Sequence, residues 1–413
     1  MAVLFASPAA RAEPESSCVT CHEKEKDEVL TVERESVHWR AGLDCAGCHG
    51  GDPAAEKKEA AKAAGTGYLG KIEKSAIPEL CGSCHADVRR MNPYGLPTDQ
   101  LAQYRTSHHG EALFGKGDTE VATCVDCHHS HGVFAASDPR SPVHPKNVPE
   151  TCRRCHSDQE KMSSHSLESD QEELYRKSIH AQMLFEKNDL AAPTCVTCHG
   201  NHGAVPPGFS RVELVCGKCH IKQKELFDLG PHAAPAQKGD FEACVTCHSN
   251  HKVLPATKKL YRTCKLCHEK GDKAYAAARD IYKLLDDVRK RYEVTQEKLG
   301  EASRAGFETD DEQVLMVDAR TYLMQLAPLQ HQLDVDKLRA VAGRVEKITL
   351  EVEHSLENKK NVIKIRKLAL IPLSGFMLLM SFGFWLKKRE LQNKNGKVNK
   401  MLQEGSSHGS RDE

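Results

Sequence analysis

The chain has 413 residues, with 58 basic and 58 acidic side chains and only 5% aromatic residues. The zero formal net charge argues against nucleic acid as a partner, and the few aromatic side chains leave little to fill the core of an ordinary enzyme of this length. Eighteen cysteines and 23 histidines are the unusual part of the composition.

The first 12 residues, MAVLFASPAARA, form a short apolar run that ends in Ala10, Arg11 and Ala12. An A-x-A ending is typical of a signal-peptidase site, although the usual basic start is missing. We expect residues 1–12 to be the remnant of a signal peptide and the mature chain to begin near Glu13. The alternative is an N-terminus that is merely disordered.

Every cysteine lies in a Cys-x-x-Cys pair that is followed at once by histidine. Two thiols at this spacing reach the two vinyl groups of one haem as thioethers, and the adjacent histidine meets the iron. One such motif alone could equally be a zinc knuckle or a redox dithiol. Nine motifs without a leftover cysteine predict nine covalently attached haem c groups.

The predicted thioether cysteines are Cys18, Cys21, Cys45, Cys48, Cys81, Cys84, Cys124, Cys127, Cys152, Cys155, Cys195, Cys198, Cys216, Cys219, Cys244, Cys247, Cys264 and Cys267. The predicted proximal iron ligands are His22, His49, His85, His128, His156, His199, His220, His248 and His268.

The motifs form an internal repeat of one leading motif at Cys18 and four two-motif units. A lone histidine precedes each unit, in S-V-H, S-H-H, S-I-H and the variant G-P-H. In the last three units the first motif is followed by a further histidine, three positions after the proximal one. The first unit has Gly50, Gly51 and Asp52 at that place.

Low-spin electron-transfer haems need a second axial ligand, and enough histidines lie outside the motifs to supply one for every iron. The repeat register favours His109 over His108 and His131 over His129. Two members of the set, His144 and His165, lie outside the repeat and could be ordinary solvated histidines. If His144 or His165 does not ligate an iron, His331 could do so instead. The proposed distal ligands are His38, His109, His131, His144, His165, His180, His202, His232 and His251.

After His268 the composition changes to cysteine-free segments with helical periodicity. One apolar stripe is predicted on Ile281, Leu284, Leu285, Val288 and Tyr292. A second is predicted on Val314, Val317, Tyr322 and Leu326, with Thr309 and Glu312 at capping-box spacing. A third, on Leu338, Val341, Val345, Ile348 and Val352, has the spacing of a coiled-coil seam. This region either supports the haem domain or forms a homo-oligomer.

Residues Leu368 to Leu386 contain no charged side chain and are long enough to cross a bilayer. The alternative is a buried helix of a soluble protein. Basic residues flank both ends, so they do not orient the span. Haem attachment outside the bacterial cytoplasm places the motifs in the periplasm, and the tail from Lys387 to Glu413 in the cytoplasm.

The doubled motifs, SHHG at Ser107–Gly110 and CHGNHG at Cys198–Gly203, give the chain a resemblance to the low-potential multihaem cytochromes c of anaerobic respiration. The resemblance covers about residues 15–360. It implies electron relay between the quinone pool, or an inner-membrane dehydrogenase, and periplasmic or terminal redox proteins. The membrane quinol-dehydrogenase cytochromes of the nitrite and nitrate systems carry an N-terminal anchor. The C-terminal span here argues against direct quinol oxidation.

The expected fold is mostly α and irregular, with a loop-rich haem domain, long helices and one C-terminal transmembrane helix. The expected segments are a signal remnant (1–12), a nonahaem domain (13–270), a haem-free helical region (271–366), a membrane span (367–387) and a cytoplasmic tail (388–413). The alternative function is a multihaem reductase of nitrite, hydroxylamine or a sulfur oxyanion. Such enzymes usually keep one iron open or use a CxxCK motif, whereas all nine motifs here end in histidine.

Overall fold

The computed structural model describes residues 16–203, 212–254 and 260–406. The proposed signal remnant and the last seven residues of the proposed tail, 407–413, lie outside these residues. Throughout the described ranges the regular structure is helical, without a strand, and turns and loops join the helices. This confirms the expected fold class. The chain divides into two compact units, Met1–Ala278 and Arg279–Glu413.

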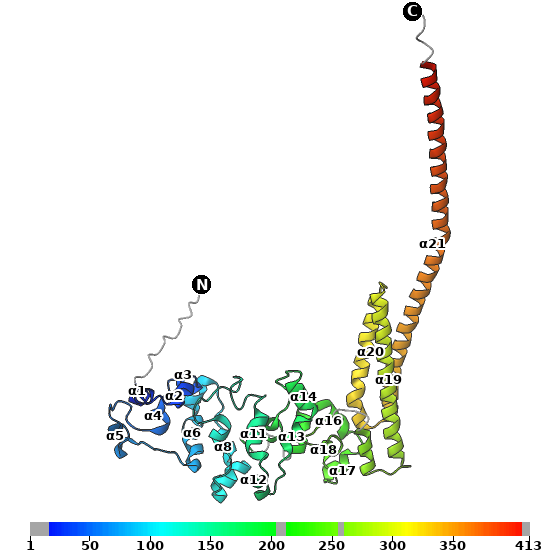
Figure 1. The fold of residues 1–413 in the computed structure, drawn as a ribbon. Coiled ribbons are helices and arrows are strands. Elements are labelled where there is room, and N and C mark those ends of the chain that lie inside the picture. Colours follow the sequence, from blue (N-terminus) through cyan, green and yellow to red (C-terminus); the bar gives the residue numbers. More distant parts are fainter. Residues whose placement is uncertain (1–15, 204–211, 255–259, 407–413) are drawn as a thin grey trace, which may run out of the picture. The chain divides into compact units, whose positions relative to one another are not determined.

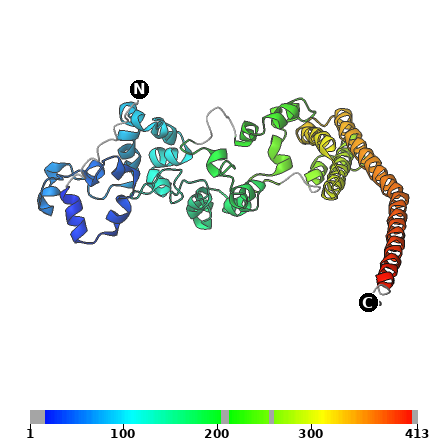
Figure 2. The same ribbon diagram turned by 90° about the horizontal axis from the view of Figure 1, so that it is seen from above.

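In the first unit the helices follow one another in chain order, from α1 to α18 (Figures 1 and 2). Seven of the nine Cys-x-x-Cys-His motifs lie wholly on a short helix. The motifs at Cys216 and Cys264 each end two residues after a short helix. The motif helices are α1 (Ser17–Lys24), α4 (Cys45–His49), α6 (Ile77–His85), α10 (Cys124–His128), α11 (Val148–His156), α15 (Cys195–His199), η5 (Val212–Lys218), α18 (Ala243–His248) and η6 (Leu260–Leu266).

A second set of short helices begins at or beside the lone histidine of each unit. These are α3 (Val37–Arg40), α9 (His108–Gly110), α14 (Ile179–Phe185) and α17 (Ala233–Lys238). The remaining helices connect the two sets. They are α2 (Glu28–Glu33), α5 (Lys58–Ala61), η1 (Ala64–Thr66), η2 (Lys74–Ala76), α7 (Val88–Met91), η3 (Asn92–Tyr94), α8 (Gln100–Arg105), η4 (Glu111–Gly115), α12 (Gln159–Ser164), α13 (Gln171–Arg176) and α16 (Ile221–Asp228).

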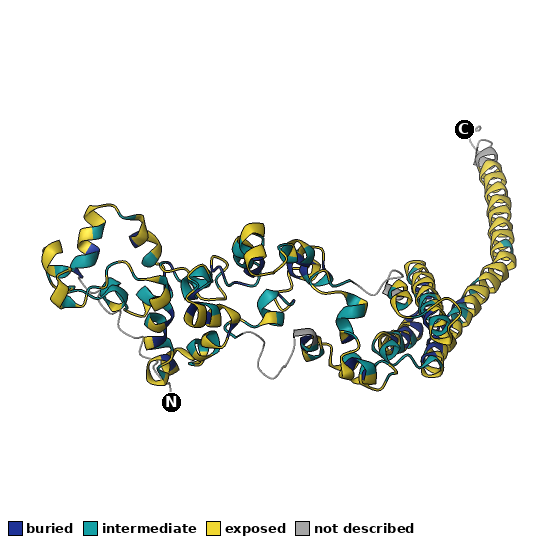
Figure 3. Ribbon diagram, turned by 90° about the horizontal axis from the view of Figure 1, so that it is seen from below, coloured by how far each residue is buried: buried dark blue, intermediate teal, exposed yellow. Residues whose placement is uncertain are grey.

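Few side chains of the first unit are buried, and most of its ribbon is of exposed or intermediate residues (Figure 3). The polypeptide exposes 28787 Å² in total, whereas a compact monomer of 45.8 kDa would expose about 16,000 Å². The long C-terminal helix accounts for part of the excess. Among the described residues of the first unit, the buried apolar side chains are few and are spread over many short helices.

The second unit is built from three long helices, α19 (Lys273–Arg304), α20 (Asp310–Leu329) and α21 (Val335–Ser406), with the short η7 (Gln330–Gln332) before α21. Helix α19 starts in the first unit. The first predicted stripe buries Ile281 and Val288 on α19, and the third buries Leu338, Val345 and Val352 on α21. These helices therefore pack with the periodicity that the sequence predicts.

The second predicted stripe is confirmed at Leu326, which is buried, but wrong at Val314 and Val317. Val314 and Val317 are 65% and 63% exposed, and the buried face of α20 is made by Glu312, Met316, Ala319 and Leu326. A charged residue lies on this face because the Lys359 ammonium contacts the Glu312 carboxylate at 2.7 Å. The expected capping box is also absent, since Thr309 makes no side-chain cap hydrogen bond.

Helix α21 continues without interruption from the packed stripe through the predicted membrane span. The helix is long and apolar enough to cross a membrane, with a mean hydropathy of 1.8 over its most apolar window, none of which is buried. Pro372 lies inside it. Side chains such as Leu378 and Phe384 are 72% and 70% exposed, as expected for a helix that lipid would cover.

Candidate haem-binding site

The lone histidine of each of the first three units is positioned by a helix cap. Ser36, Ser107 and Ser178 are buried, and each accepts a hydrogen bond through Oγ from the amide three residues later. A serine cap satisfies one of the orphan amides of a helix start and fixes its first turn. The histidine two positions after the serine is therefore held on a defined face. In the fourth unit His232 is itself the N-cap of α17.

Seven of the proposed distal histidines face a motif histidine, with ring centroids 5.9 to 6.3 Å apart. Two imidazoles that ligate one metal from opposite sides, at metal–nitrogen distances near 2 Å, have centroids about 6 Å apart. The pairs are His38–His85, His49–His131, His109–His156, His128–His202, His180–His220, His199–His251 and His232–His268. Their spacing fits one haem iron between the members of each pair.

The pairing follows a rule that crosses the repeat units. The lone histidine of a unit faces the second motif of the same unit, as His38 faces His85 and His180 faces His220. The histidine that follows a first motif faces the first motif of the preceding unit, as His131 faces His49 and His202 faces His128. Each of the last three units thus places one histidine against the first motif of the preceding unit.

The two kinds of pair also differ in ring orientation. The three pairs that join successive units are nearly parallel, with interplanar angles of 10° to 15°. The four pairs within a unit are inclined by 29° to 65°. First-motif and second-motif sites are therefore distinct environments, and they alternate along the chain.

Main-chain hydrogen bonds hold the two distal histidines of neighbouring units at fixed spacing. The amide of Val37, just before His38, donates to the carbonyl of Val133, two residues after His131, at 2.9 Å. The amide of Ile179, just before His180, donates to the carbonyl of Val253, two residues after His251, at 3.1 Å. The same backbone register is thus used at two places in the repeat.

A sharp turn follows each first motif. Gly50, His129, Gly200 and Ser249, which directly follow the motif histidines, all have φ between 65° and 84°. A glycine adopts this conformation without strain. At Gly50 an added Cβ would lie 2.1 Å from the carbonyl oxygen of Gly67, so that position excludes any side chain. The turn directs the residues after the motif away from its helix.

The cysteines of successive motifs approach one another. First cysteines lie close together between motifs three and four, five and six, and seven and eight, where Cys124, Cys195 and Cys216 raise the pKa of Cys81, Cys152 and Cys244 respectively. Between motifs one and two, burial and then the charge of Cys18 raise the pKa of Cys45.

At the other junctions first and second cysteines both take part. Burial raises the pKa of Cys48 and of Cys127, and the charges of Cys84 and Cys155 respectively add to the increase. Burial and then the charges of Cys216, Cys195 and Cys219 raise the pKa of Cys198 to about 11, and burial and then the charges of Cys264 and Cys267 raise that of Cys247. Successive motifs therefore lie next to one another along the chain.

Burial also lowers the pKa of most paired histidines. It lowers the pKa of His128 to about 4, and the charge of the facing His202 adds to the effect. Burial is also the main cause that lowers the pKa of His109 and of His199. The neutral imidazole is the form that ligates a metal, so these rings are held ready for ligation at neutral pH.

Three members of the predicted set have other surroundings. His22 donates a hydrogen bond through Nδ1 to Asp27 Oδ2 at 2.8 Å. His144 is buried, and its Nδ1 accepts from the amide of Lys146 at 3.3 Å. His165 Nε2 lies 3.7 Å from Asp118 Oδ2, and its charge acts on the nearby His109–His156 pair. The ligation of His22 and His248, and the roles of His144 and His165, stay predictions.

Sequence reasoning missed two tyrosines. The hydroxyls of Tyr104 and Tyr175 donate at 2.9 Å to the carbonyls of Ala122 and Pro193, each two residues before the first cysteine of the next unit. Burial raises the pKa of Tyr104 to about 12, so the hydroxyl keeps its proton. The available signal was a tyrosine three residues before Ser107 and Ser178.

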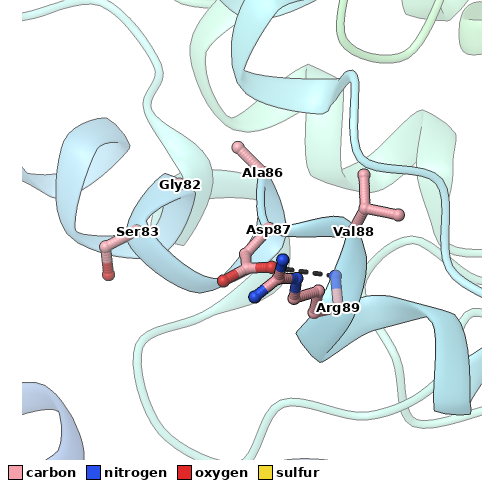
Figure 4. Close-up of a pocket in the computed structure, with 6 residues that line it drawn as sticks. All are labelled: Gly82, Ser83, Ala86, Asp87, Val88 and Arg89. Carbon is pink, nitrogen blue, oxygen red and sulfur yellow. Dashed lines mark hydrogen bonds between the residues drawn. The ribbon is translucent and has the colours of Figure 1, made fainter.

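A surface hollow of about 570 Å³ lies beside the third motif and is lined by Gly82, Ser83, Ala86, Asp87, Val88 and Arg89 (Figure 4). Its carboxylate is already used, because Asp87 Oδ1 accepts from the amides of Arg89 and Arg90 as the cap of α7. The hollow is open, and its carboxylate is already engaged in the helix cap, so we assign no substrate to it.

The chain is similar in sequence to known cytochromes. The sequence model of the cytochrome c3 family matches residues 37–139, which hold the first two lone histidines and three of the motifs. The multiheme cytochrome MtrA of Shewanella baltica (strain OS185) is 28% identical over 224 residues, which cover 50% of this chain and 53% of that protein. The chain thus spans about half the length of this relative.

Proposed function

Because the chain is a multihaem c-type cytochrome, we propose that its nine motifs carry nine haems and that these form one continuous electron relay. The observation that carries the proposal is that successive motifs adjoin one another. The helices of motifs one and two, of motifs three and four, and of motifs five to nine in order contact each other. The charge of Cys84 acts on Cys48 and that of Cys155 on Cys127 at the two remaining junctions. Haems held at adjoining motifs would be neighbours, so their order would follow the order of the motifs in the sequence.

The haems supply one-electron chemistry, and the residues of this chain position them and set their environment. In the proposal the motif cysteines bind each ring covalently and the paired histidines ligate its iron on both sides. The ring distances of 5.9 to 6.3 Å support bis-histidine ligation at seven sites. Ligation on both sides leaves no open coordination position, which favours electron transfer over substrate binding.

The proposal extends to where the relay works. An apolar C-terminal helix supports anchoring in the inner membrane by residues 368–386. The haem unit then lies in the periplasm, and the end of the chain in the cytoplasm. Electrons would pass between the quinone pool, or an inner-membrane dehydrogenase, and periplasmic or terminal redox proteins in anaerobic respiration. The exchange with these partners takes place at the two ends of the haem series.

Electron paramagnetic resonance of the oxidised full-length protein tests relay against enzyme. We expect low-spin ferric signals that account for at least the seven paired sites, and no turnover of nitrite, hydroxylamine or sulfite under reducing conditions. A spectrum dominated by high-spin ferric haem, together with turnover of one of these compounds, would show that the chain is a multihaem reductase.

A further inference from the structure

The first motif histidine has a carboxylate at its second ring nitrogen. His22 Nδ1 lies 2.8 Å from Asp27 Oδ2. If Nε2 faces the iron, Nδ1 carries the ring proton and donates it to a carboxylate. A hydrogen bond to an ionised acceptor is shorter and stronger than one to a neutral acceptor.

The Asp27 carboxylate is fixed in this position by a second task. Asp27 is the N-cap of α2, and its Oδ1 accepts from the amide of Val29 at 3.1 Å. One oxygen is thus bound to the helix start, and the other is directed to the imidazole. The backbone also joins the two residues, since the Asp27 amide donates to the His22 carbonyl at 3.1 Å.

Other motif histidines have weaker partners at this nitrogen. His49 Nδ1 lies 3.3 Å from the carbonyl oxygen of Gly70, which is a neutral acceptor. His268 Nδ1 is 4.0 Å from Asp272 Oδ2, too far for a hydrogen bond. Among His22, His49 and His268, only His22 has a carboxylate within hydrogen-bond distance of Nδ1.

We propose that Asp27 is a tuning residue that lowers the reduction potential of the haem at Cys18 and Cys21. Negative charge at Nδ1 makes the imidazole a stronger electron donor at Nε2, and a stronger donor stabilises the ferric state relative to the ferrous state. The inference rests on the proposed attachment of haem to the first motif. It makes the N-terminal haem the one whose potential depends on a protein carboxylate.

The experiment is a potentiometric titration of the full-length nonahaem protein and its Asp27→Asn variant. Asparagine caps helices as well as aspartate does, so α2 stays intact while the charge is lost. We expect one of the one-electron components to shift to a more positive potential and the others to superimpose on those of the wild type. Asp27→Glu, which restores the charge, should move that component back.

Asp158→Asn is the matched control. Asp158 also caps a short helix just after a motif histidine, and it accepts from the amide of Lys161 at 3.0 Å. Its removal should leave the titration unchanged. If Asp27→Asn has no effect, or if Asp158→Asn produces an equal shift, the tuning role is wrong while the relay stands. If mass analysis finds no haem on the Cys18–Cys21 peptide, the nine-haem proposal itself fails.

Discussion

At the scale of single residues, the histidine that follows a first motif acts on the preceding unit. His202 follows the motif of Cys195 and Cys198, yet its ring faces His128, with the centroids 6.2 Å apart. We predict that His202→Ala converts one iron from low-spin to high-spin, because one of its two axial imidazoles is lost. Electron paramagnetic resonance of the oxidised variant measures the change.

His129→Ala is the control for this substitution. His129 directly follows His128 in the sequence but forms none of the seven ring pairs. Its spectrum should match that of the wild type. If His202→Ala leaves every iron low-spin, or if His129→Ala produces the high-spin signal, the pairing across units is wrong.

Much of this site could be predicted from the residues, but the pairing could not. The motif spacing identifies the cysteines and proximal histidines because the covalent chemistry is local. The repeat register favours His109 and His131 over their neighbours, and these are the rings that face motif histidines. Which two imidazole rings face each other depends on contacts between segments that are far apart in the sequence. The contact of Asp27 with His22 could not be predicted either, because a single aspartate after a motif has no recognisable sequence pattern.

At the scale of elements, α20 shows why a stripe of apolar residues can mislead. Val314 and Val317 have the right spacing, but the helix turns Glu312 inward instead. The buried carboxylate contacts Lys359 at 2.7 Å and accepts from the Ser355 hydroxyl. The partners lie more than 40 residues away in sequence, so no local pattern in α20 reveals them.

This buried contact predicts an acid-sensitive helical unit. Burial favours the neutral form of Glu312, but hydrogen bonds from Lys359 and Ser355 outweigh it and hold the pKa below its usual value. The stabilisation is therefore present above the unfolded-state pKa, near 4.3, and is lost as the pH falls through the lower folded-state pKa. Glu312→Gln should cost roughly 1–2 kcal/mol at pH 7, because Lys359 keeps some access to water.

Thermal unfolding of the detergent-solubilised protein, followed by circular dichroism, measures this loss. The exposed Glu301 of α19 provides the matched control, and Glu301→Gln should leave the unfolding temperature unchanged. Equal stability of Glu312→Gln and the wild type at pH 7 would contradict the assigned role of the buried carboxylate.

The two classes of ring pair predict two classes of low-spin iron. Nearly parallel imidazole planes split the iron d orbitals more strongly than inclined planes do, so the sites of His49, His128 and His199 should give a more rhombic signal than those of His85 and His156. Electron paramagnetic resonance of the wild type should resolve both kinds. His202→Ala should remove intensity from the rhombic set alone, and loss from the other set would contradict the assignment.

At the scale of the whole molecule, the long helix α21 joins a packed bundle segment to an apolar segment. A chain that ends at Lys367 lacks the apolar segment but keeps the buried residues from Leu338 to Leu356. We predict that it moves from the membrane fraction to the soluble fraction with its haem content unchanged. A chain that ends at Arg389 keeps the segment and should remain in the membrane. Haem absorbance in the two fractions measures the outcome.

The fold class follows from composition, because a chain with many haem motifs and few aromatic residues cannot bury a core of side chains. The order of the sites does not follow from composition. It depends on which cysteines meet, as Cys81 meets Cys124 and Cys152 meets Cys195, and these contacts join segments more than 40 residues apart.

Pulse radiolysis of the oxidised full-length protein tests the continuous relay most directly, because it places one electron on the surface and follows its redistribution among the haems. We predict a first-order phase, independent of protein concentration, in which the electron moves from the haem first reduced to those of highest potential. If the haems that are first reduced stay reduced until a second protein molecule collides, the series is broken and the relay is contradicted.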